Sequence, residues 1–378
     1  MAYDKVVDSA SLDSKLTQVA DAIRTKGNTS AGLQFPSGFI SAIQAIQTGT
    51  ELQIIVSVTS GATVTATKGS KVVSGTSVDG TCTLVVPEEG EWTVSATLGG
   101  ETSRSNIVNV TSSYDTTLVF ISPILNDNSW ETIRGISDAG TGENFWSIGD
   151  RKAVTLNGTV GALTLSNYTT YAFIIGFNHN SSVEGANRIH FQLGKTALSG
   201  GTDVALCDNS YNLIGGGVRM NTSDSNSGGW ESSFMRKYIC GTSMISYSNT
   251  IIAVIPEALR TVLKYVTKYT NNTGRLQPGM ESATATTDYF FLLSEYEVFG
   301  TFRVANVGES KKQAQYSYYS SGNSKVKYNY NAIGTAVTWW LRSPVESDSE
   351  QFATCYMSGE VSGDDARKSY GFAPGFCV

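Results

Sequence analysis

Apolar and polar residues alternate through residues 51–112, and turn signals interrupt this alternation roughly every 8–12 residues. The turn signals are GA, KGS, VDG, PEEG and LGG, and they separate runs such as LQIIVSV and EWTVSAT. Side chains of a strand point to alternate faces, so this period gives each strand one apolar face. Short strands at such spacing favour a small β-sandwich with Trp92 in its core. We find no site residues here and interpret this domain as a spacer.

The segment before the sandwich has a helical period instead. Apolar residues recur at helical spacing in residues 12–27 and again in residues 35–49. The apolar positions are Leu12, Leu16, Val19, Ala20 and Ile23 in the first stretch, and Phe39, Ile43 and Ile46 in the second. Two helices this short bury little apolar surface by themselves. Residues 1–50 are therefore expected to be a helical segment that packs on a partner or on copies of itself.

Residues 113–378 are expected to form a third, larger unit. Strand-like runs occur in TTLVFI, KAVTL, YAFIIGF, RIHFQL and YFFLLSEYEVFG. Two helical stretches, GGWESSFMRKYI and IPEALRTVLKYVTKYT, interrupt them. This mixture predicts an α+β domain with much loop. The tyrosine-rich run from Gln315 to Ala332 is expected to be strand–turn–strand, either an ordinary hairpin or one that displays an aromatic face.

Composition argues against several classes of protein. The net charge is -6 and the pI is about 5.1, whereas proteins that bind nucleic acid backbones present basic surfaces. The start of the chain lacks the basic and apolar regions of a signal peptide, and no segment has the apolar length of a membrane span. We therefore expect no nucleic acid partner, no membrane insertion and synthesis in the cytoplasm.

Candidates for chemistry are few. The five cysteines form no CxxC pair and there are two histidines, so a zinc site is not expected. The cysteines are interpreted as buried thiols, with a Cys355–Cys377 bridge as the alternative. His179 is interpreted as a structural histidine, and Asp364–Asp365 as a solvated pair. Nucleophile-elbow, phosphate-loop and calcium-loop motifs are not found, so we expect no catalytic residues, metal or cofactor.

The most unusual motif is WWLRSP, from Trp339 to Pro344, because it stands directly before a polar, irregular segment. Trp339, Trp340 and Leu341 can form a rigid floor, and Arg342 can pin the following loop by donating to backbone carbonyls. Pro344 ends the strand ladder, and the closing GFAPGFCV is expected to return to the core. A rigid aromatic floor below a polar segment is typical of a binding module.

The third unit resembles the C-type-lectin-type domain of variable proteins from diversity-generating retroelements, and undiversified relatives in prophages and surface proteins of Gram-positive gut bacteria. The pieces that carry this resemblance are FWSIGDRKAV, IIGFNHN, GGWESSFMR, FFLLSEYEVFG, WWLRSP and GFAPGFCV. Residues 1–50 are similar to the N-terminal segment of phage tail proteins, and residues 51–112 resemble their Ig-like spacers. The resemblance implies a receptor-binding protein of a phage or prophage tail tip, attached to other tail proteins through residues 1–50. By analogy with tail fibres, it also implies a homotrimer.

In that family the C-terminal variable region, here about residues 340–378, displays the ligand-binding side chains on one exposed face. The resemblance places the candidate contact residues at Val345, Glu346, Asp348, Glu350, Thr354, Tyr356, Ser358, Glu360, Ser362, Asp364, Asp365, Arg367, Ser369 and Tyr370. It places the scaffold at Trp339, Trp340, Leu341, Arg342, Phe352, Gly371, Pro374 and Phe376. The expected ligand is a host cell-surface protein or glycan, with basic or polar contacts to match the acidic segment.

Two alternatives remain open at this stage. Randomised Asn codons yield Tyr, Ser, Asp, Val or Arg but never Glu, Gln, Lys or Met, so residues of these four types in the variable region are fixed, come from other codons, or mark an undiversified relative. These residues are Glu346, Glu350, Gln351, Met357, Glu360 and Lys368. A bacterial surface adhesin of the same fold is therefore the second hypothesis. The third is an enzyme like the formylglycine-generating sulfatase activators, which would require a role for Cys355 or Cys377.

Overall fold

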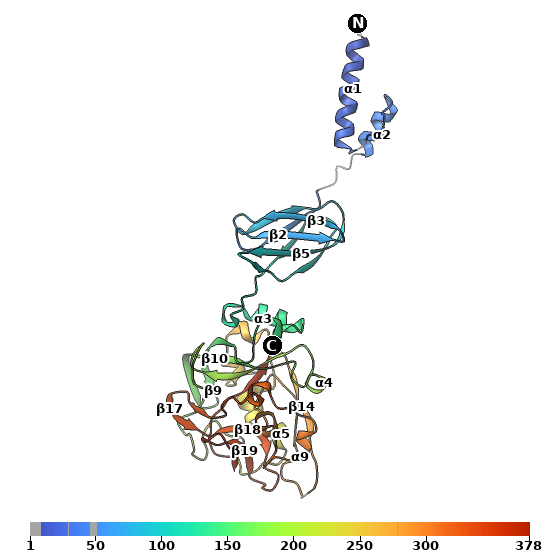
Figure 1. The fold of residues 1–378 in the computed structure, drawn as a ribbon. Coiled ribbons are helices and arrows are strands. Elements are labelled where there is room, and N and C mark those ends of the chain that lie inside the picture. The colour runs from blue at the N-terminus through green and yellow to red at the C-terminus, as the bar shows by residue number, and fades with distance from the viewer. Residues whose placement is uncertain (1–8, 29, 46–50, 278) are drawn as a thin grey trace. The chain divides into compact units, whose positions relative to one another are not determined.

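The computed structural model describes residues 9–28, 30–45, 51–277 and 279–378. It divides the chain into two compact units, residues 1–120 and 121–378. Both contain more strand than helix, and the whole chain is a mixed α+β protein (Figure 1). Among the described helices, none combines the length and apolar character needed to cross a membrane.

The first unit begins with helices α1 (Ser9–Lys26) and α2 (Ser37–Ala45), as the helical period predicts. Ala20, Ile23 and Phe39 form their small shared core. Ile43, which the period places beside Phe39, is instead 53% exposed, and Ile46 lies outside the described residues.

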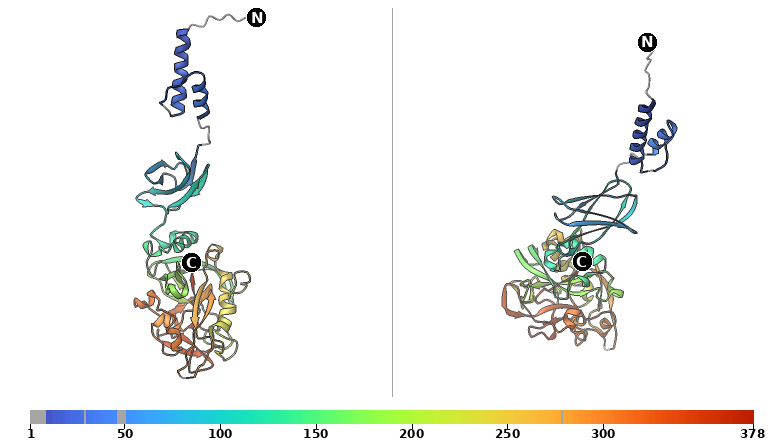
Figure 2. Two further views of the ribbon diagram at one scale, coloured as in Figure 1. Left: turned by 90° about the vertical axis from the view of Figure 1, so that its right-hand side faces the viewer. Right: turned by 45° about the horizontal axis from the view of Figure 1, so that its top comes forward.

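A two-layered β-sandwich follows, and Figure 2 shows it from two further sides. One sheet has the strand order β4-β1-β8, and the other the order β3-β2-β5-β6, with β7 also paired to β5. The strands are β1 (Gln53–Ser57), β2 (Thr63–Lys68), β3 (Lys71–Thr76), β4 (Thr81–Val85), β5 (Gly90–Leu98), β6 (Glu101–Thr102), β7 (Asn106–Val110) and β8 (Tyr114–Thr117). Trp92 is fully buried between the sheets, among the alternate apolar residues of β1, β2 and β5.

The sandwich continues beyond residue 112, where the sequence places its end. β8 pairs in parallel with β1, and Leu118 joins the core of the sandwich. The run TTLVFI therefore contributes mainly to the sandwich, because Leu118 lies in the sandwich core and Phe120 packs against it, whereas Ile121 belongs to the core of the larger unit.

The C-terminal unit contains four small sheets around one extensive apolar core. The strand orders are β15-β21-β11-β10-β9, β12-β16-β17, β13-β14 and β18-β19-β20. The strands are β9 (Arg151–Val160), β10 (Leu163–Phe177), β11 (Ile189–Lys195), β12 (Val204–Ala205), β13 (Val266–Thr270), β14 (Thr284–Asp288), β15 (Phe290–Phe291), β16 (Lys327–Asn329), β17 (Ala332–Val337), β18 (Trp339–Pro344), β19 (Gln351–Cys355), β20 (Val361–Asp365) and β21 (Gly375–Cys377). β21 pairs with β11 and β15, so GFAPGFCV does return to the core.

Helices of one or two turns connect these strands. They are η1 (Leu125–Asp127), α3 (Trp130–Asp138), η2 (Gly142–Asn144), α4 (Ser181–Glu184), α5 (Gly229–Ser232), the π-helix η3 (Met235–Gly241), α6 (Ile251–Val254), α7 (Glu257–Arg260), α8 (Glu295–Phe299), α9 (Val307–Ser310) and α10 (Ser317–Ser320). β18 and β19 lie toward the end of this unit opposite α3 (Figures 1 and 2).

Three predictions of local structure are wrong or incomplete. The helix expected over IPEALRTVLKYVTKYT ends at Arg260, and its last residues form β13, whose alternate side chains are buried against the core. In YFFLLSEYEVFG only Phe290 and Phe291 are strand, because Ser294 caps α8 through a capping box with Glu297.

The tyrosine-rich run does not display an aromatic face. It forms α10 and then β16, and Tyr316, Tyr318 and Tyr319 are buried. Each buried hydroxyl has a partner: Tyr316 Oη lies 2.8 Å from Lys268 Nζ, Tyr318 Oη 2.9 Å from Lys195 Nζ, and Tyr319 Oη 2.6 Å from Gln192 Oε1. Tyrosine is tolerated in a core when its hydroxyl finds such a partner.

Helix α3 offers a test of local stability. The Ser129 hydroxyl accepts a 3.0 Å hydrogen bond from Thr132 N and so caps the helix, which buries Trp130, Ile133 and Ile136. Ser129→Ala is expected to lower the free energy of unfolding by about 1 kcal/mol. Ser320→Ala is the control in chemical denaturation, because the exposed Ser320 only donates to a helical carbonyl. Equal losses in the two variants would contradict the capping role.

Candidate ligand-binding face

The floor of the candidate face is β18, all six residues of which are buried. β18 pairs with β19, and β19 pairs with β20, so the floor continues into the segment that follows it. The indole Nε1 of Trp339 donates to Lys325 O at 2.9 Å, and that of Trp340 to Val218 O at 3.3 Å. All eight residues expected to be scaffold are buried. We call residues 345–370, which follow the floor, the display segment.

Arg342 has a different role from the predicted one. Its guanidinium donates to the backbone carbonyls of Leu292 at 2.8 Å and Tyr269 at 3.5 Å, but its main partner is the carboxylate of Glu297 in α8. Its Nε also donates to Thr270 Oγ1 at 2.8 Å. Arg342 therefore ties β18 to α8 and β13, underneath the floor, and does not pin the display segment.

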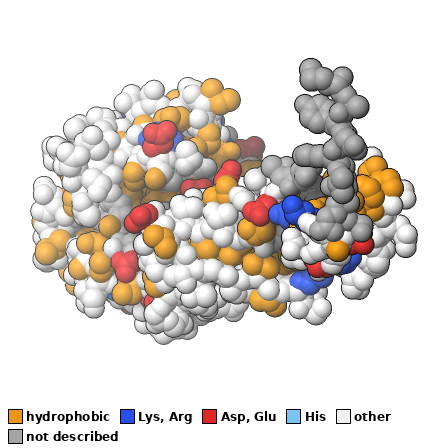
Figure 3. All heavy atoms as spheres, turned by 90° about the horizontal axis from the view of Figure 1, so that it is seen from above, with side chains coloured by type: hydrophobic (Ala, Val, Ile, Leu, Met, Phe, Trp, Pro, Cys, Tyr) orange, Lys and Arg blue, Asp and Glu red, His pale blue; other side chains and the backbone are white. Residues whose placement is uncertain are grey.

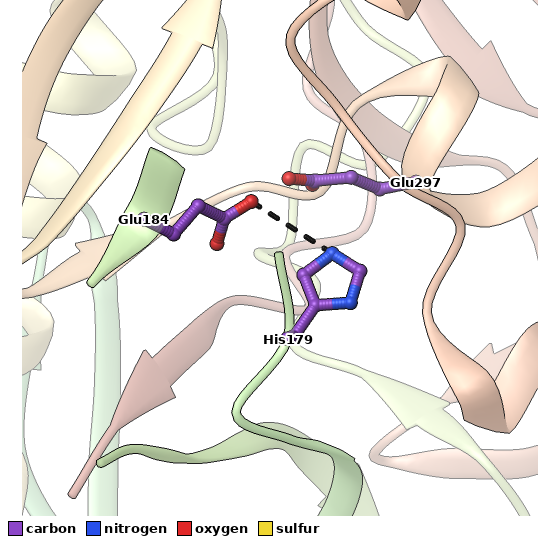
Figure 4. A group of neighbouring side chains, drawn as sticks. All are labelled: His179, Glu184 and Glu297. Carbon is purple, nitrogen blue, oxygen red and sulfur yellow. Dashed lines mark ion pairs between the residues drawn. The ribbon is translucent and has the colours of Figure 1, made fainter. Parts of the chain in front are cut away.

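Arg342 belongs to a buried cluster of charged groups that also contains Lys268, Glu184, Glu297 and His179. Figure 4 shows three of these side chains pointing toward one another, with His179 Nε2 3.7 Å from a carboxylate oxygen of Glu184. Lys268 Nζ lies 2.5 Å from Glu184 and 2.9 Å from Glu297. The two cations and two carboxylates compensate one another inside the core.

Three of these groups, His179, Glu184 and Glu297, have ligand atoms close enough together to hold a metal ion. Lys268 already supplies a positive charge between the two carboxylates, and Arg342 holds both oxygens of Glu297. His179 stacks on Tyr316 with 3.8 Å between ring centroids, and burial lowers the pKa of His179 to about 3. We therefore assign this cluster a structural role.

The structure divides the fourteen predicted contact residues by their exposure. Glu350, Tyr356, Ser358 and Glu360 are exposed, whereas Glu346, Asp348, Ser362, Asp364, Asp365 and Arg367 are half-buried. The other four, Val345, Thr354, Ser369 and Tyr370, are buried. These four cannot contact a ligand at the surface as expected. Ser369 instead donates to Asp208 at 2.8 Å, and Tyr370 packs edge-on against Trp340.

The most exposed part of the display segment is the turn between β19 and β20. Tyr356 is 45% exposed and Met357 is 41% exposed, although both residues follow a fully buried Cys355. The turn is fixed by hydrogen bonds from Tyr356 N to Glu360 O at 2.7 Å and from Gly359 N to Tyr356 O at 2.8 Å. An aromatic and a thioether side chain on a fixed turn can bury apolar area at little cost in conformational entropy.

The two cations near the end of the segment, Arg367 and Lys368, form ion pairs. Arg367 forms an ion pair with Asp224, and Lys368 Nζ lies 2.7 Å from Asp364. The loop that leads into β19 is held by buried Asn226, whose amide nitrogen lies within 3.1 Å of the carbonyl oxygens of Val345, Asp348 and Gln351.

Leu213 and Ile214 also lie beside the display segment, and the sequence did not indicate them. They are 60% and 58% exposed, and Ser369 N donates to Leu213 O at 3.0 Å. Tyr211, two residues before Leu213, packs edge-on against Tyr370. Burial raises the pKa of Tyr211, and the nearby Tyr356 hydroxyl adds to this rise. The signal in the sequence was this apolar pair, which stands directly before three consecutive glycines, Gly215–Gly217.

The cysteines do not provide a reactive group. All five are free and buried, so the alternative Cys355–Cys377 bridge is not formed. Burial raises the pKa of both Cys355 and Cys377 to about 12, which disfavours the thiolate that a nucleophile requires.

Much of the surface is uncharged. On the face drawn in Figure 3 white polar groups and backbone predominate, and charged side chains are scattered among them.

Comparison with known proteins shows one likeness: residues 203–378, which include the whole display segment, match a family model described as a domain of unknown function, DUF6273. No curated protein matches this chain.

Proposed function

We propose that this chain is a receptor-binding protein of a phage or prophage tail tip, and that its C-terminal unit is a C-type-lectin-type domain. In this proposal the display segment binds a host cell-surface ligand, the sandwich is an Ig-like spacer, and the N-terminal helices attach the protein to other tail proteins. We further propose that the protein is not an enzyme, which the burial and raised pKa of its cysteines support.

The observation that carries the proposal is the contrast between the floor and the turn above it. β18 is buried at every residue, yet Tyr356 and Met357 are both more than 40% exposed. A floor that does not depend on the turn side chains allows those side chains to change without unfolding the domain. Together with Leu213 and Ile214, the turn offers exposed apolar side chains with paired charges at the side. This combination suits a protein ligand better than a small polar one.

Sequencing the DNA around the gene tests the proposed class directly. A reverse transcriptase gene beside a near-copy of the codons for residues 340–378, differing at template adenines, is the result expected for a diversified receptor binder. Tail genes without a retroelement would leave a binder of fixed specificity. The absence of both kinds of gene would overturn the tail-tip proposal and favour the surface adhesin.

The turn is expected to dominate binding. We expect the double change Tyr356→Ser with Met357→Ser to weaken binding of the labelled full chain to Gram-positive cells roughly tenfold or more, because apolar anchors dominate interfaces. Flow cytometry over a panel of strains provides the measurement. The matched control is Ile245→Ser, which changes an apolar residue that is 96% exposed and outside the display segment. If the control weakens binding as much as the double change, the turn is not the contact.

A further inference from the structure

A pocket of about 560 Å³ lies in the C-terminal unit, and none of its lining residues belongs to the display segment. Its walls come from the turn at residues 148–151, the loop at residues 198–200, and Tyr318 of α10. This volume lies within the range of pockets that bind small molecules.

Lys195, which lines this pocket, shares one carboxylate with a second buried lysine, Lys327, which is outside the lining. Lys195 is 4% exposed and Lys327 is fully buried, and the ion-pair partner that the described residues give to both is Asp203. Lys195 Nζ also lies 2.9 Å from Tyr318 Oη, whereas Lys327 Nζ is 3.7 Å from Asp203. Burying two ammonium groups with one carboxylate leaves a positive charge uncompensated. Burial, together with the positive charge of Lys195, lowers the pKa of Lys327 to about 8.

The pocket wall adds a third cation. Arg151 is half-buried and donates to Ala197 O at 2.7 Å, and within the described part of the chain it forms no ion pair. Asp150 also lines the pocket, and its Oδ2 accepts a 2.8 Å hydrogen bond from Ser147 N. Asp150, Arg151 and Lys195 line the pocket, and Asp203 and Lys327 are buried next to Lys195 outside the lining. These three cations and two carboxylates together carry one net positive charge.

The remaining walls are of two kinds. Asn323 and Ser199 offer polar groups, and Asp150 can accept hydrogen bonds from hydroxyls through its second oxygen. Ile124, Ile148 and Leu198 offer apolar surface. A sugar ring suits both kinds of wall, because its hydroxyls need hydrogen-bond donors and acceptors while its C–H faces pack on apolar side chains.

We propose that this pocket binds a sugar that carries one anionic group, either a carboxylate or a phosphate. The anion lies against Arg151 and Lys195, and the hydroxyls lie toward Asp150 and Asn323. This site is separate from the display segment, and it does not depend on the proposed tail-tip function.

Isothermal titration of the full chain with glucuronate, glucose 6-phosphate, glucose and inorganic phosphate tests this proposal. At least one of the two acidic sugars is expected to bind tenfold or more tightly than glucose and inorganic phosphate, because charge-assisted hydrogen bonds are the stronger ones. Tighter binding of glucuronate identifies a carboxylate sugar, and tighter binding of glucose 6-phosphate a phosphorylated one. If neither acidic sugar binds more tightly than glucose, the proposal is wrong.

Two variants locate the binding. Arg151→Gln is expected to weaken binding of the acidic sugar about tenfold or more, with little effect on any glucose binding. Leu198→Trp, at a side chain that is 46% exposed, fills the pocket without altering charge and is expected to weaken all sugars. The matched control is Arg188→Gln, because Arg188 is also half-buried, donates to the carbonyls of Tyr265 and Ala186, and lines a different pocket of about 420 Å³. Near-UV circular dichroism verifies folding. Loss of binding in the Arg188 variant with retention in the Arg151 variant would overturn the assignment.

Discussion

Replacing Glu297 by Gln is expected to lower the free energy of unfolding of the C-terminal unit by about 3–5 kcal/mol. Glu297 is fully buried in α8, where it accepts from Lys268 at 2.9 Å and from both terminal nitrogens of Arg342. Gln preserves the size of the side chain but removes its charge, so Lys268 keeps Glu184 as its ion-pair partner while Arg342 loses the ion pair with Glu297. Chemical denaturation followed by tryptophan fluorescence measures the loss, because Trp92 is the one tryptophan of six outside residues 121–378.

The pH dependence of this loss separates electrostatics from packing. Burial raises the pKa of Glu184 to about 7, so Glu184 supplies a full negative charge to Lys268 only at higher pH. The Glu297→Gln variant should therefore lose more stability at pH 5 than at pH 8. Glu257→Gln, at an exposed position in the first turn of α7, is the control and should change stability by less than about 0.5 kcal/mol. A loss below about 1 kcal/mol in the Glu297 variant would mean that the buried cations find other partners.

The sequence predicted those elements whose pattern is local. The period-2 alternation around Trp92 identifies the sandwich, and the helical period identifies α1 and α2. The prediction of one helix over residues 256–270 is wrong because these residues contain both α7 and β13. The strand β13 depends on its pairing with β14. Local propensity cannot show that pairing, since the partner lies further along the chain.

The candidate face was predicted in part for the same reason. Buried Trp339 and Trp340 and exposed Tyr356 follow from residue type and from the family resemblance. The burial of Ser369 does not, because its hydroxyl is satisfied by Asp208, which is 161 positions away in the chain. Nor could Lys268 be placed in the core, since a buried lysine is predictable only when its carboxylate partners are known.

The stability of the C-terminal unit is expected to change little between pH 6.5 and 4.5 and then to fall steeply toward pH 3. Burial lowers the pKa of His179 to about 3 and that of His190 well below its usual value. As the pH falls, the two histidines therefore take up protons in the unfolded chain before they do so in the folded chain. Stability from neutral histidines is thus present above pH 6.5 and is lost as the pH falls. Burial raises the pKa of Glu184 and of Glu309 to about 7, so their contribution is full below about pH 4.5 and is lost as the pH rises through 7.

These opposite slopes offset each other between pH 4.5 and 6.5, where all four groups titrate in one state or the other. Below pH 4.5 Glu184 and Glu309 contribute nothing more, whereas His179 removes about 2 kcal/mol over the next 1.5 pH units. His190 and Glu297, whose pKa Arg342 and Lys268 hold below its usual value, add losses of the same sign. Denaturant midpoints measured at half-unit steps of pH test this curve.

The variant that isolates the histidine effect is His179→Phe, because phenylalanine can still stack on Tyr316 but cannot bind a proton. Below pH 4.5 its stability should fall less steeply than that of the wild-type chain, by about 1.4 kcal/mol per pH unit. At pH 7, where the buried ring is neutral, the two proteins should differ by less than about 1.5 kcal/mol. The chain contains one other histidine, His190, so the slope that remains in the variant comes from His190 together with carboxylates whose pKa is lowered in the folded chain, such as Glu297. An unchanged slope of stability against pH would mean that proton uptake by His179 does not destabilise the folded chain. The carboxylates and cations of the buried cluster would then remain paired in acid.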